Sequence, residues 1–337
     1  MFGGGRRGRW RSGGRAFRQH ERDFPAGHCG LWGLGSEDGT LSGQKTFTSQ
    51  NHCLSSVAGV TEIPPLLTEA LRDRYLIERE VGHGAMATVF LAHDVRQQQP
   101  VAIKIMHRNL SASLDVERFR REMGIAASLS HPSIVPLFES GNVCGVPYYS
   151  MPYIEGGSLF QRLARERQLS LDEALRITHE VADALGYAHG FGILHRDVKP
   201  ENILLANTRA LVADFGLARA IGLANYRKLT DTGIMVGSVF YISPEQLLGE
   251  RDLDQRADIY SLGCLLYEML TGEPPYAGPV AQGVFTRILR KPVPSARRLR
   301  ATVPDTVDEA LGRALAKSAA ERFTSMAEFA AALPSHG

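Results

Sequence analysis

The stretch REVGHGAMATVF, residues 79–90, carries glycines at a spacing that could bind phosphate. Gly82 and Gly84 fit the first two positions of G-x-G-x-x-G, and Ala87 stands at the third. Backbone N–H groups of a glycine turn can approach phosphate oxygens closely because no side chain intervenes. A dinucleotide-binding fold needs a helix directly after the glycines, and a Walker loop needs Gly-Lys-Ser/Thr. Neither follows here, and the β-branched and aromatic residues of ATVFLAHDV instead favour a turn between two strands.

A glycine turn that lies over phosphates needs a cation nearby, and the next predicted strand contains one. Lys104 stands in VAIK, 22 residues after Gly82. With these residues the chain resembles the eukaryotic-type Ser/Thr protein kinase family in its bacterial branch, whose signature includes a glycine loop followed by V-A-I-K. The resemblance continues over residues 70–334. It implies transfer of the γ-phosphate of ATP to protein Ser/Thr hydroxyls with Mg²⁺, or Mn²⁺ in its place.

Two further motifs carry the resemblance. ILHRDVKPENILL matches H-R-D-x-x-x-x-N at Asp197 and Asn202, and DFG begins at Asp214, 17 residues after Asp197. The resemblance implies that Asp197 orients the substrate hydroxyl and accepts its proton, while Asn202 and Asp214 offer oxygen ligands to Mg²⁺. It also implies that Lys199 helps to neutralise the transferring phosphate, which is the pattern of Ser/Thr rather than tyrosine kinases.

The resemblance also implies a nucleotide pocket. Glu122 lies along the apolar stripe of a helix predicted within residues 111–130, and the family pattern pairs it with Lys104. Met151 would lie at the back of the adenine pocket, before a hinge at residues 152–154 whose backbone binds adenine. SMPY fits a plain strand equally well, and only the resemblance separates the two interpretations. The other implied nucleotide-binding residues are Val81, Gly82, Gly84, Val89, Ala102, Tyr153, Ile154 and Leu204.

Residues 214–245 resemble an activation segment, which ends in SPE where the family often has A-P-E. The resemblance implies a structural ion pair between Glu245 and Arg322. Arg196 is implied to bind a phosphorylated residue of the segment. Thr230 and Thr232 are the candidates for autophosphorylation, with an unmodified polar loop as the alternative, and a dimer that phosphorylates in trans is a further expectation.

Two other functions would use part of the same residue set. A small-molecule phosphotransferase of related fold also needs a lysine and two metal-binding side chains, but it would generally lack a long segment with a threonine pair and SPE. A catalytically weak signalling scaffold would have lost Lys104, Asp197, Asn202 or Asp214, and all four are present. The sequence favours an active protein kinase over both alternatives.

The elements that position these residues fall into two parts. Strand-like runs at residues 75–81, 87–95 and 100–106 are followed by one helix and further strands. Beyond residue 155 the pattern is helical: Ser170 and Glu173 form a capping box, and residues 254–275 are apolar around most of the helix. We therefore predict an α+β fold of two lobes, with an N-lobe at about 70–151, a hinge at 152–154 and a C-lobe at about 155–334.

The bulk composition is that of an ordinary globular protein. A net charge of +2 does not indicate nucleic acid as a partner, and no apolar run reaches the roughly 18 residues of a membrane span. The four cysteines are scattered, which favours a reducing compartment and a cytoplasmic location. Protein substrates with Ser or Thr are the expected partners.

Residues 1–66 differ from the rest because they are rich in Gly, Ser and Arg, with seven arginines in the first 22 residues. We predict a disordered extension; a basic arm for anionic partners, or sequence upstream of the true start, are the alternatives. His28-Cys29 and His52-Cys53 lack the spacing of zinc ligands.

Overall fold

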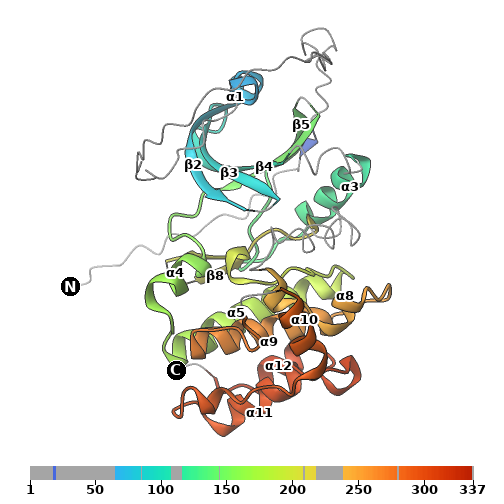
Figure 1. Ribbon diagram of the computed structural model, residues 1–337. Helices are drawn as coiled ribbons and strands as arrows, with labels where there is room; N and C mark the ends of the chain where they lie inside the picture. The colour runs from blue at the N-terminus through green and yellow to red at the C-terminus, as the bar shows by residue number, and fades with distance from the viewer. Residues whose placement is uncertain are drawn as a thin grey trace, which may run out of the picture.

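The fold, a computed structural model, has a small sheet-containing lobe above a larger helical lobe (Figure 1). This is the two-lobed α+β arrangement predicted from the sequence. The structure describes residues 18–19, 65–84, 86–107, 116–143, 145–207, 209–217, 238–278 and 281–335.

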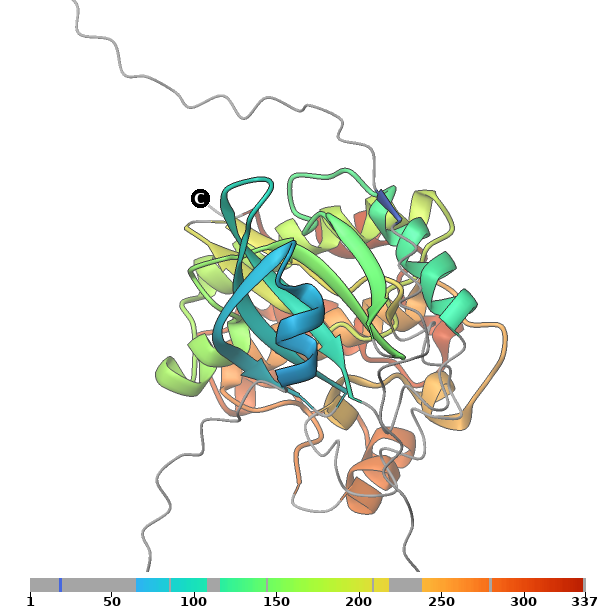
Figure 2. The same cartoon turned by 90° about the horizontal axis from the view of Figure 1, so that it is seen from above.

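The small lobe is built on one mixed sheet, with its strands in the order β1-β5-β6-β4-β3-β2. Neighbouring strands are antiparallel except β1 and β5, which are parallel. The strands are β1 (Arg18–Gln19), β2 (Tyr75–His83), β3 (Ala87–Asp94), β4 (Gln99–Met106), β5 (Glu139–Val143) and β6 (Val146–Pro152). Seen from above, α1 (Pro65–Leu71) crosses the sheet and α3 (Val116–Ala127) lies beside it near β5 (Figure 2).

Strand register decides which side chains of the small lobe face the large one. Lys104 on β4 lies opposite Tyr149 on β6, and Ala102 lies opposite Met151. Because side chains alternate along a strand, these four residues share one face of the sheet. That face belongs to a hydrophobic cluster with α3 and with residues from the large lobe, while Tyr148 and its alternating neighbours pack in a separate cluster on the other face.

The large lobe is organised around α9 (Arg256–Thr271), in which every residue from Ala257 to Thr271 except Glu268 is buried. α5 (Leu171–Gly190) packs against it and begins where Ser170 accepts a hydrogen bond from the backbone N–H of Glu173 at 3.2 Å. The remaining helices are α4 (Leu159–Glu166), α8 (Pro244–Leu248), α10 (Ala281–Arg290), α11 (Asp305–Ala314) and α12 (Met326–Ala331). A hairpin of β7 (Ile203–Ala206) and β8 (Arg209–Val212) lies under the small lobe.

Most of residues 1–66, which we predicted to be a disordered extension, lies outside the described residues, and that prediction stays a prediction. Arg18–Gln19 pair with Glu139 and Ser140, so that two residues of this segment extend the sheet as β1. α1 begins at Pro65, close to the expected start of order. Across the described ranges, no helix is both long enough and apolar enough to cross a membrane.

Candidate active site

Three side chains meet where the sheet faces the large lobe. Lys104 forms an ion pair with Oδ2 of Asp214, and the hydroxyl of Tyr149 donates a hydrogen bond to Oδ1 of the same carboxylate. Burial by itself would raise the pKa of Asp214, but the charge of Lys104 and the hydrogen bonds from Lys104 and Tyr149 outweigh it and lower the pKa below its ordinary value. Asp214 is therefore held as a carboxylate.

Lys104 is predicted from the family resemblance to pair with Glu122. The structure shows an ion pair between Lys104 and Asp214. Glu122 lies buried on α3, and its Oε1 is 3.8 Å from the guanidinium of Arg121. The Lys104–Glu122 pair therefore stays a prediction.

Gly216, the glycine of DFG, explains how α3 can lie against this motif. Its φ of +79° is unfavourable for residues with a side chain, and a Cβ there would lie 3.2 Å from the backbone oxygen of Glu122. Any larger residue would be strained and would push on α3. The DFG segment and α3 are thus in direct backbone contact.

The HRD segment places three functional side chains together. Nζ of Lys199 lies 2.7 Å from Oδ2 of Asp197, and Nδ2 of Asn202 donates to the same oxygen at 3.1 Å and to the Asp197 carbonyl at 2.8 Å. Burial by itself would lower the pKa of Lys199, but the charges of Asp197 and Glu201 outweigh it and raise the pKa. Lys199 is therefore a partly buried cation that holds one oxygen of Asp197.

The residues predicted to hold a metal fit that role by their chemistry. With Nδ2 of Asn202 engaged by Asp197, the oxygen end of that amide is the one left for a cation. The backbone N–H of Ala213 donates to the carbonyl of Asn202 at 2.9 Å, which puts Asp214 next to Asn202. An amide oxygen and a carboxylate are ligands that Mg²⁺ prefers.

Asp258 on α9 anchors the backbone of the HRD segment through hydrogen bonds, a role that was not predicted from the sequence. Its carboxylate accepts hydrogen bonds from the backbone N–H groups of His195 at 2.9 Å and Arg196 at 2.7 Å, and it lies 2.8 Å from Nε2 of His189. Burial by itself would raise the pKa of Asp258, but its hydrogen bond with His189 and the positive charges nearby outweigh it and lower the pKa. The sequence signal for this role was a carboxylate within a helix whose other side chains are mostly apolar, since an acid is rarely buried without partners.

The imidazole of His195 ties the HRD segment to DFG. Its Nε2 donates to the carbonyl of Ala213 at 2.8 Å, and its Nδ1 accepts from the backbone N–H of Asp197 at 3.2 Å. The ring therefore connects the residue before Asp214 to Asp197 itself. Arg196, which lies between His195 and Asp197 in the sequence, has a φ of +67°, and Asp214 has the same value. Each of the two motifs therefore contains one residue with left-handed backbone at a position proposed to be functional.

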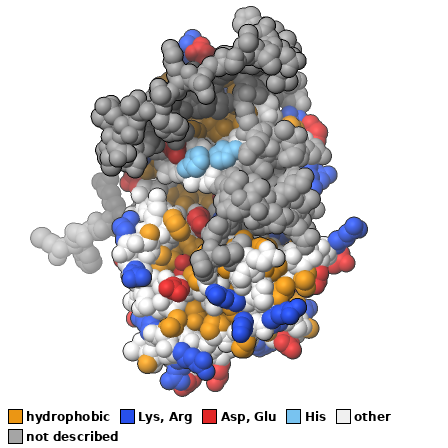
Figure 3. Space-filling model, viewed as in Figure 1, with side chains coloured by type: hydrophobic (Ala, Val, Ile, Leu, Met, Phe, Trp, Pro, Cys, Tyr) orange, Lys and Arg blue, Asp and Glu red, His pale blue; other side chains and the backbone are white. Residues whose placement is uncertain are grey.

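Five of the apolar and aromatic residues predicted to line the nucleotide pocket share one cluster between the lobes. Ala102 and Met151 are buried members of it, and Val89, Tyr153 and Leu204 pack against it. Val81 and Ile154 are partly exposed, next to the glycine turn and in the hinge. On the face shown in Figure 3, hydrophobic side chains gather in the hollow between the two lobes.

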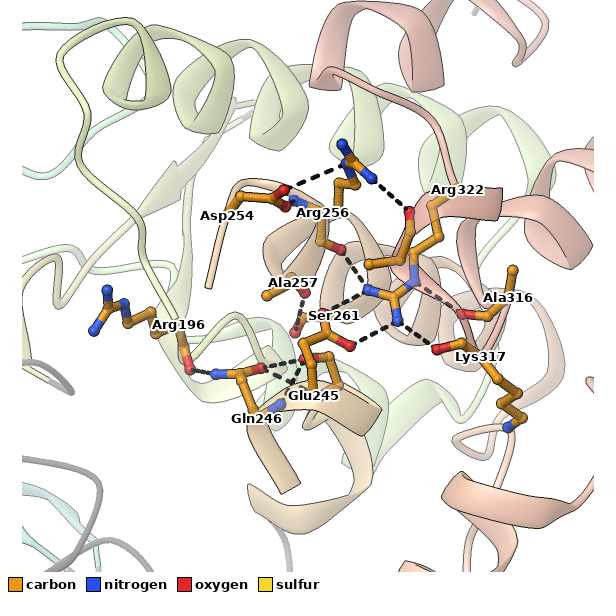
Figure 4. Close-up of polar contacts among 12 residues, drawn as sticks. Arg196, Glu245, Gln246, Asp254, Arg256, Ala257, Ser261, Ala316, Lys317 and Arg322 are labelled. Carbon is orange, nitrogen blue, oxygen red and sulfur yellow. Dashed lines mark hydrogen bonds and ion pairs between the residues drawn. The ribbon is translucent and has the colours of Figure 1, made fainter. Parts of the chain in front are cut away.

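The predicted ion pair between Glu245 and Arg322 is present deep in the large lobe (Figure 4). Two guanidinium nitrogens donate to the two carboxylate oxygens at 2.7 and 2.8 Å. Arg322 also donates to the carbonyls of Ala316 at 2.8 Å, Arg256 at 2.9 Å and Lys317 at 3.2 Å. Burial by itself would raise the pKa of Glu245, but Arg322 outweighs it and lowers the pKa.

Ser243, which stands where the family often has alanine, caps α8. Its Oγ accepts from the backbone N–H of Gln246 at 3.4 Å, and the Gln246 side chain accepts from the backbone N–H of Ser243 at 3.2 Å. Gln246 also donates to the carbonyl of Arg196 at 2.9 Å, so α8 contacts the HRD segment. Thr230 and Thr232 lie outside the described residues, and their phosphorylation and the role of Arg196 stay predictions.

Comparison with known proteins gave consistent matches. A family model described as the protein kinase domain matches residues 75–332. The serine/threonine-protein kinase PknB of Mycobacterium leprae is 38% identical over 270 residues, which are 78% of this chain and 43% of the relative. The serine/threonine-protein kinase PknJ of Mycobacterium tuberculosis is 39% identical over 264 residues, which are 76% of this chain and 44% of the relative. The chain thus spans less than half the length of these curated relatives.

A solved structure gives the same result for the fold. The crystal structure of a mutant of the Mycobacterium tuberculosis PknI kinase domain aligns with a TM-score of 0.62 and 34% sequence identity. The alignment covers 77% of this chain and 93% of that one.

Proposed function

The chain belongs to the protein kinase family, in its bacterial branch of eukaryotic-type serine/threonine kinases, and we propose that it transfers the γ-phosphate of ATP to serine and threonine hydroxyls of proteins. The observation that carries the proposal is the convergence of Lys104, Asp197, Asn202 and Asp214 at the junction of the two lobes, joined by the contacts described above.

The proposed nucleotide site lies under the glycine turn. Adenine would pack between Ala102 and Leu204, with Met151 behind it and the hinge backbone at its edge. A Cβ added to Gly82 would meet only the Val89 side chain, at 3.8 Å, so packing within the protein does not demand glycine there. A close approach of phosphates to the backbone would instead explain the glycine at position 82. Lys104 would bind the same phosphates as a cation.

The proposed metal ligands are Asn202 and Asp214. Protein kinases generally use Mg²⁺, which when bound would neutralise the negative charge of the phosphates. The residues of this chain prepare the site by keeping Asp214 ionised and by fixing the amide of Asn202 through Asp197.

Asp197 is the proposed acceptor for the proton of the substrate hydroxyl. Lys199 and Asn202 hold its Oδ2 from two directions, which fixes the plane of the carboxylate. The ammonium of Lys199, 2.7 Å from Oδ2 of Asp197, would also stabilise negative charge on a phosphoryl group transferred at this carboxylate. Orientation and charge stabilisation, rather than covalent chemistry, would then account for catalysis.

Autophosphorylation of Thr230 or Thr232 in trans, within a dimer, is the proposed route of activation. The resemblance to bacterial kinases with a Thr-x-Thr pair supports it, and Arg196 offers a guanidinium beside Asp197. Mass spectrometry after incubation with ATP should find phosphate on one or both threonines, and the Asp197→Asn variant should carry none. Phosphate confined to other residues would contradict this route.

The test of the function is transfer of labelled γ-phosphate to a general protein substrate. Asp197→Asn should reduce incorporation by a factor of about 10² or more, because the hydroxyl loses its proton acceptor. Asp183→Asn changes an exposed carboxylate on α5 in the same way and should leave the rate unchanged. Equal incorporation by wild type and Asp197→Asn would overturn the mechanism, and label found only on a small molecule would favour a small-molecule phosphotransferase.

A further inference from the structure

One buried hydroxyl at the site has no role in the proposed function. Tyr149 lies on β6 with 1% of its surface exposed, and its hydroxyl donates to Oδ1 of Asp214. Lys104, its neighbour across the strand pair, contacts Oδ2 of the same carboxylate. β4 and β6 therefore supply one donor to each oxygen of Asp214.

Packing does not explain the hydroxyl. The cluster around the Tyr149 ring contains Met106, Phe119, Met123 and Met151, and a phenylalanine would fill the same space. A hydroxyl in such surroundings is unfavourable unless it is hydrogen-bonded. The partner that compensates it is Asp214.

The two donors to Asp214 are not equivalent. In the proposed function Lys104 binds the phosphates of ATP, so its contact with Oδ2 has to be exchanged when the nucleotide arrives. The phenol is anchored in an apolar wall and has Asp214 as its acceptor, so its contact with Oδ1 can persist. The exchange would leave Oδ2 for the metal while Oδ1 stays fixed.

We propose that Tyr149 is a positioning residue, whose hydroxyl fixes the carboxylate of Asp214 so that Oδ2 is presented to the metal of the bound nucleotide. The inference rests on the proposed function and names a further residue of that site. Without the hydroxyl the carboxylate can rotate about its Cβ–Cγ bond. Loss of an outer partner of a metal ligand commonly lowers metal affinity or activity by about 10–100-fold.

The test measures binding rather than turnover. The affinity for ATP is determined by titration calorimetry in EDTA and in saturating MgCl₂, and the ratio of the two dissociation constants gives the coupling between metal and nucleotide. Tyr149→Phe should bind ATP in EDTA as wild type does, and its coupling ratio should fall by about tenfold. Tyr149→Met, a second apolar replacement, should show the same loss.

Tyr148 provides a matched control. It is the preceding residue of β6 and is buried on the opposite face, where its hydroxyl donates to Oε1 of Glu139 at 3.1 Å. Tyr148→Phe therefore removes a buried hydrogen bond of the same kind away from the site, and it should leave the coupling ratio unchanged. Melting temperatures of all variants separate a change in folding from a change in coupling.

The outcomes distinguish this inference from the proposed function. If wild type binds ATP no more tightly in Mg²⁺ than in EDTA, the proposed function fails and the inference fails with it. If wild type shows the coupling and Tyr149→Phe retains it, only the inference is overturned. A larger ratio in Tyr149→Phe would also overturn it, because the hydroxyl would then compete with the metal.

Discussion

Two ion pairs in the described part of the chain lie largely away from solvent and are built in different ways. Lys104 and Asp214 meet at the junction of the lobes, where 15% of the lysine and 7% of the aspartate side chain are exposed, and a tyrosine supplies the second donor. Arg322 and Glu245 meet inside the large lobe, where the arginine side chain is fully buried and also binds three backbone carbonyls.

The number of additional partners separates the Lys104–Asp214 pair, which in the proposed function has to break when ATP binds, from the Arg322–Glu245 pair, which has to stay formed for the fold. A point charge such as Lys104 can leave Asp214 for a phosphate without breaking other hydrogen bonds. Arg322 cannot leave Glu245 without uncovering a buried carboxylate and several carbonyls at once. The number of additional partners, more than burial alone, distinguishes the proposed catalytic pair from the structural one.

The strongest test of this distinction is Lys104→Met. We expect phosphate transfer to fall by a factor of about 10³, because the phosphates lose their cation. The free energy of unfolding should fall by only about 1–2 kcal/mol, since Asp214 keeps its hydrogen bond from Tyr149 and can take up a proton. Initial rates and urea unfolding of the same preparation measure both quantities.

Lys291→Met, at an exposed position after α10, is the control and should change neither quantity. Should Lys104→Met destabilise the fold as strongly as loss of Arg322 does, the two pairs would not differ in kind.

Arg322→Met should have the opposite profile. Breaking a fully buried pair by removing one partner typically lowers the free energy of unfolding by about 3–5 kcal/mol. The fraction that remains folded should still bind ATP, because Arg322 contacts none of the proposed nucleotide ligands. Urea unfolding and ATP titration at low temperature check the two parts.

Arg120 offers an exposed pair for comparison, since it lies 3.1 Å from a glutamate that is 79% exposed. Arg120→Met should reduce the free energy of unfolding by less than about 1 kcal/mol. Equal losses in the two arginine variants would show that the network around Arg322 adds nothing to a surface pair.

A third carboxylate, the partly buried Glu268, sharpens the comparison because its partner carries no charge. Glu268 accepts a hydrogen bond from the Tyr241 hydroxyl at 2.6 Å. Burial raises the pKa of Glu268 from 4.5 to about 7, because it outweighs the hydrogen bond from Tyr241, which lowers the pKa; the charge of Glu201 makes a smaller contribution in the same direction as burial. Glu268 therefore stabilises the fold fully below pH 4.5, and this contribution is lost as the pH rises through about 7.

Glu268→Gln should remove this pH dependence, since the amide oxygen can still accept from Tyr241 and carries no proton to lose. Relative to the variant, wild type should lose about 2 kcal/mol of unfolding free energy between pH 5 and pH 8. Urea unfolding across this range measures it, with the exposed Glu309→Gln as the control that should follow wild type. Parallel profiles for Glu268→Gln and wild type would contradict the assignment.

Much of the fold followed from local patterns in the sequence. The strands alternate and the helices are periodic, and the motifs around Asp197 and Asp214 specify residue type and order, so the two-lobed fold and its family could be predicted. The Glu245–Arg322 contact was predictable for the same reason, since both residues stand in recognisable motifs.

Contacts that depend on register or on the packing of whole elements were not predictable in the same way. That Tyr149 faces Lys104 follows from the pairing of β4 with β6, which depends on the intervening helix and β5. The contact between Lys104 and Asp214 depends on how the DFG segment lies against β4, which no local pattern in the sequence specifies. The sequence identifies Asp258 only as an acid near the start of a helix. Its role as an acceptor for the backbone N–H groups of His195 and Arg196 depends on the packing of α9 against the HRD segment.

The dependence on Asp258 has a consequence while the chain is being synthesised. The backbone of His195 and Arg196 is anchored by a carboxylate that the ribosome adds 63 and 62 residues later. A nascent chain can therefore contain every proposed catalytic side chain while its catalytic loop still lacks an anchor. The strands of the small lobe pair mainly with near neighbours and can form first, as domains do when they fold from the N-terminus during translation. The proposed phosphate transfer would thus begin only after α9 has emerged and packed.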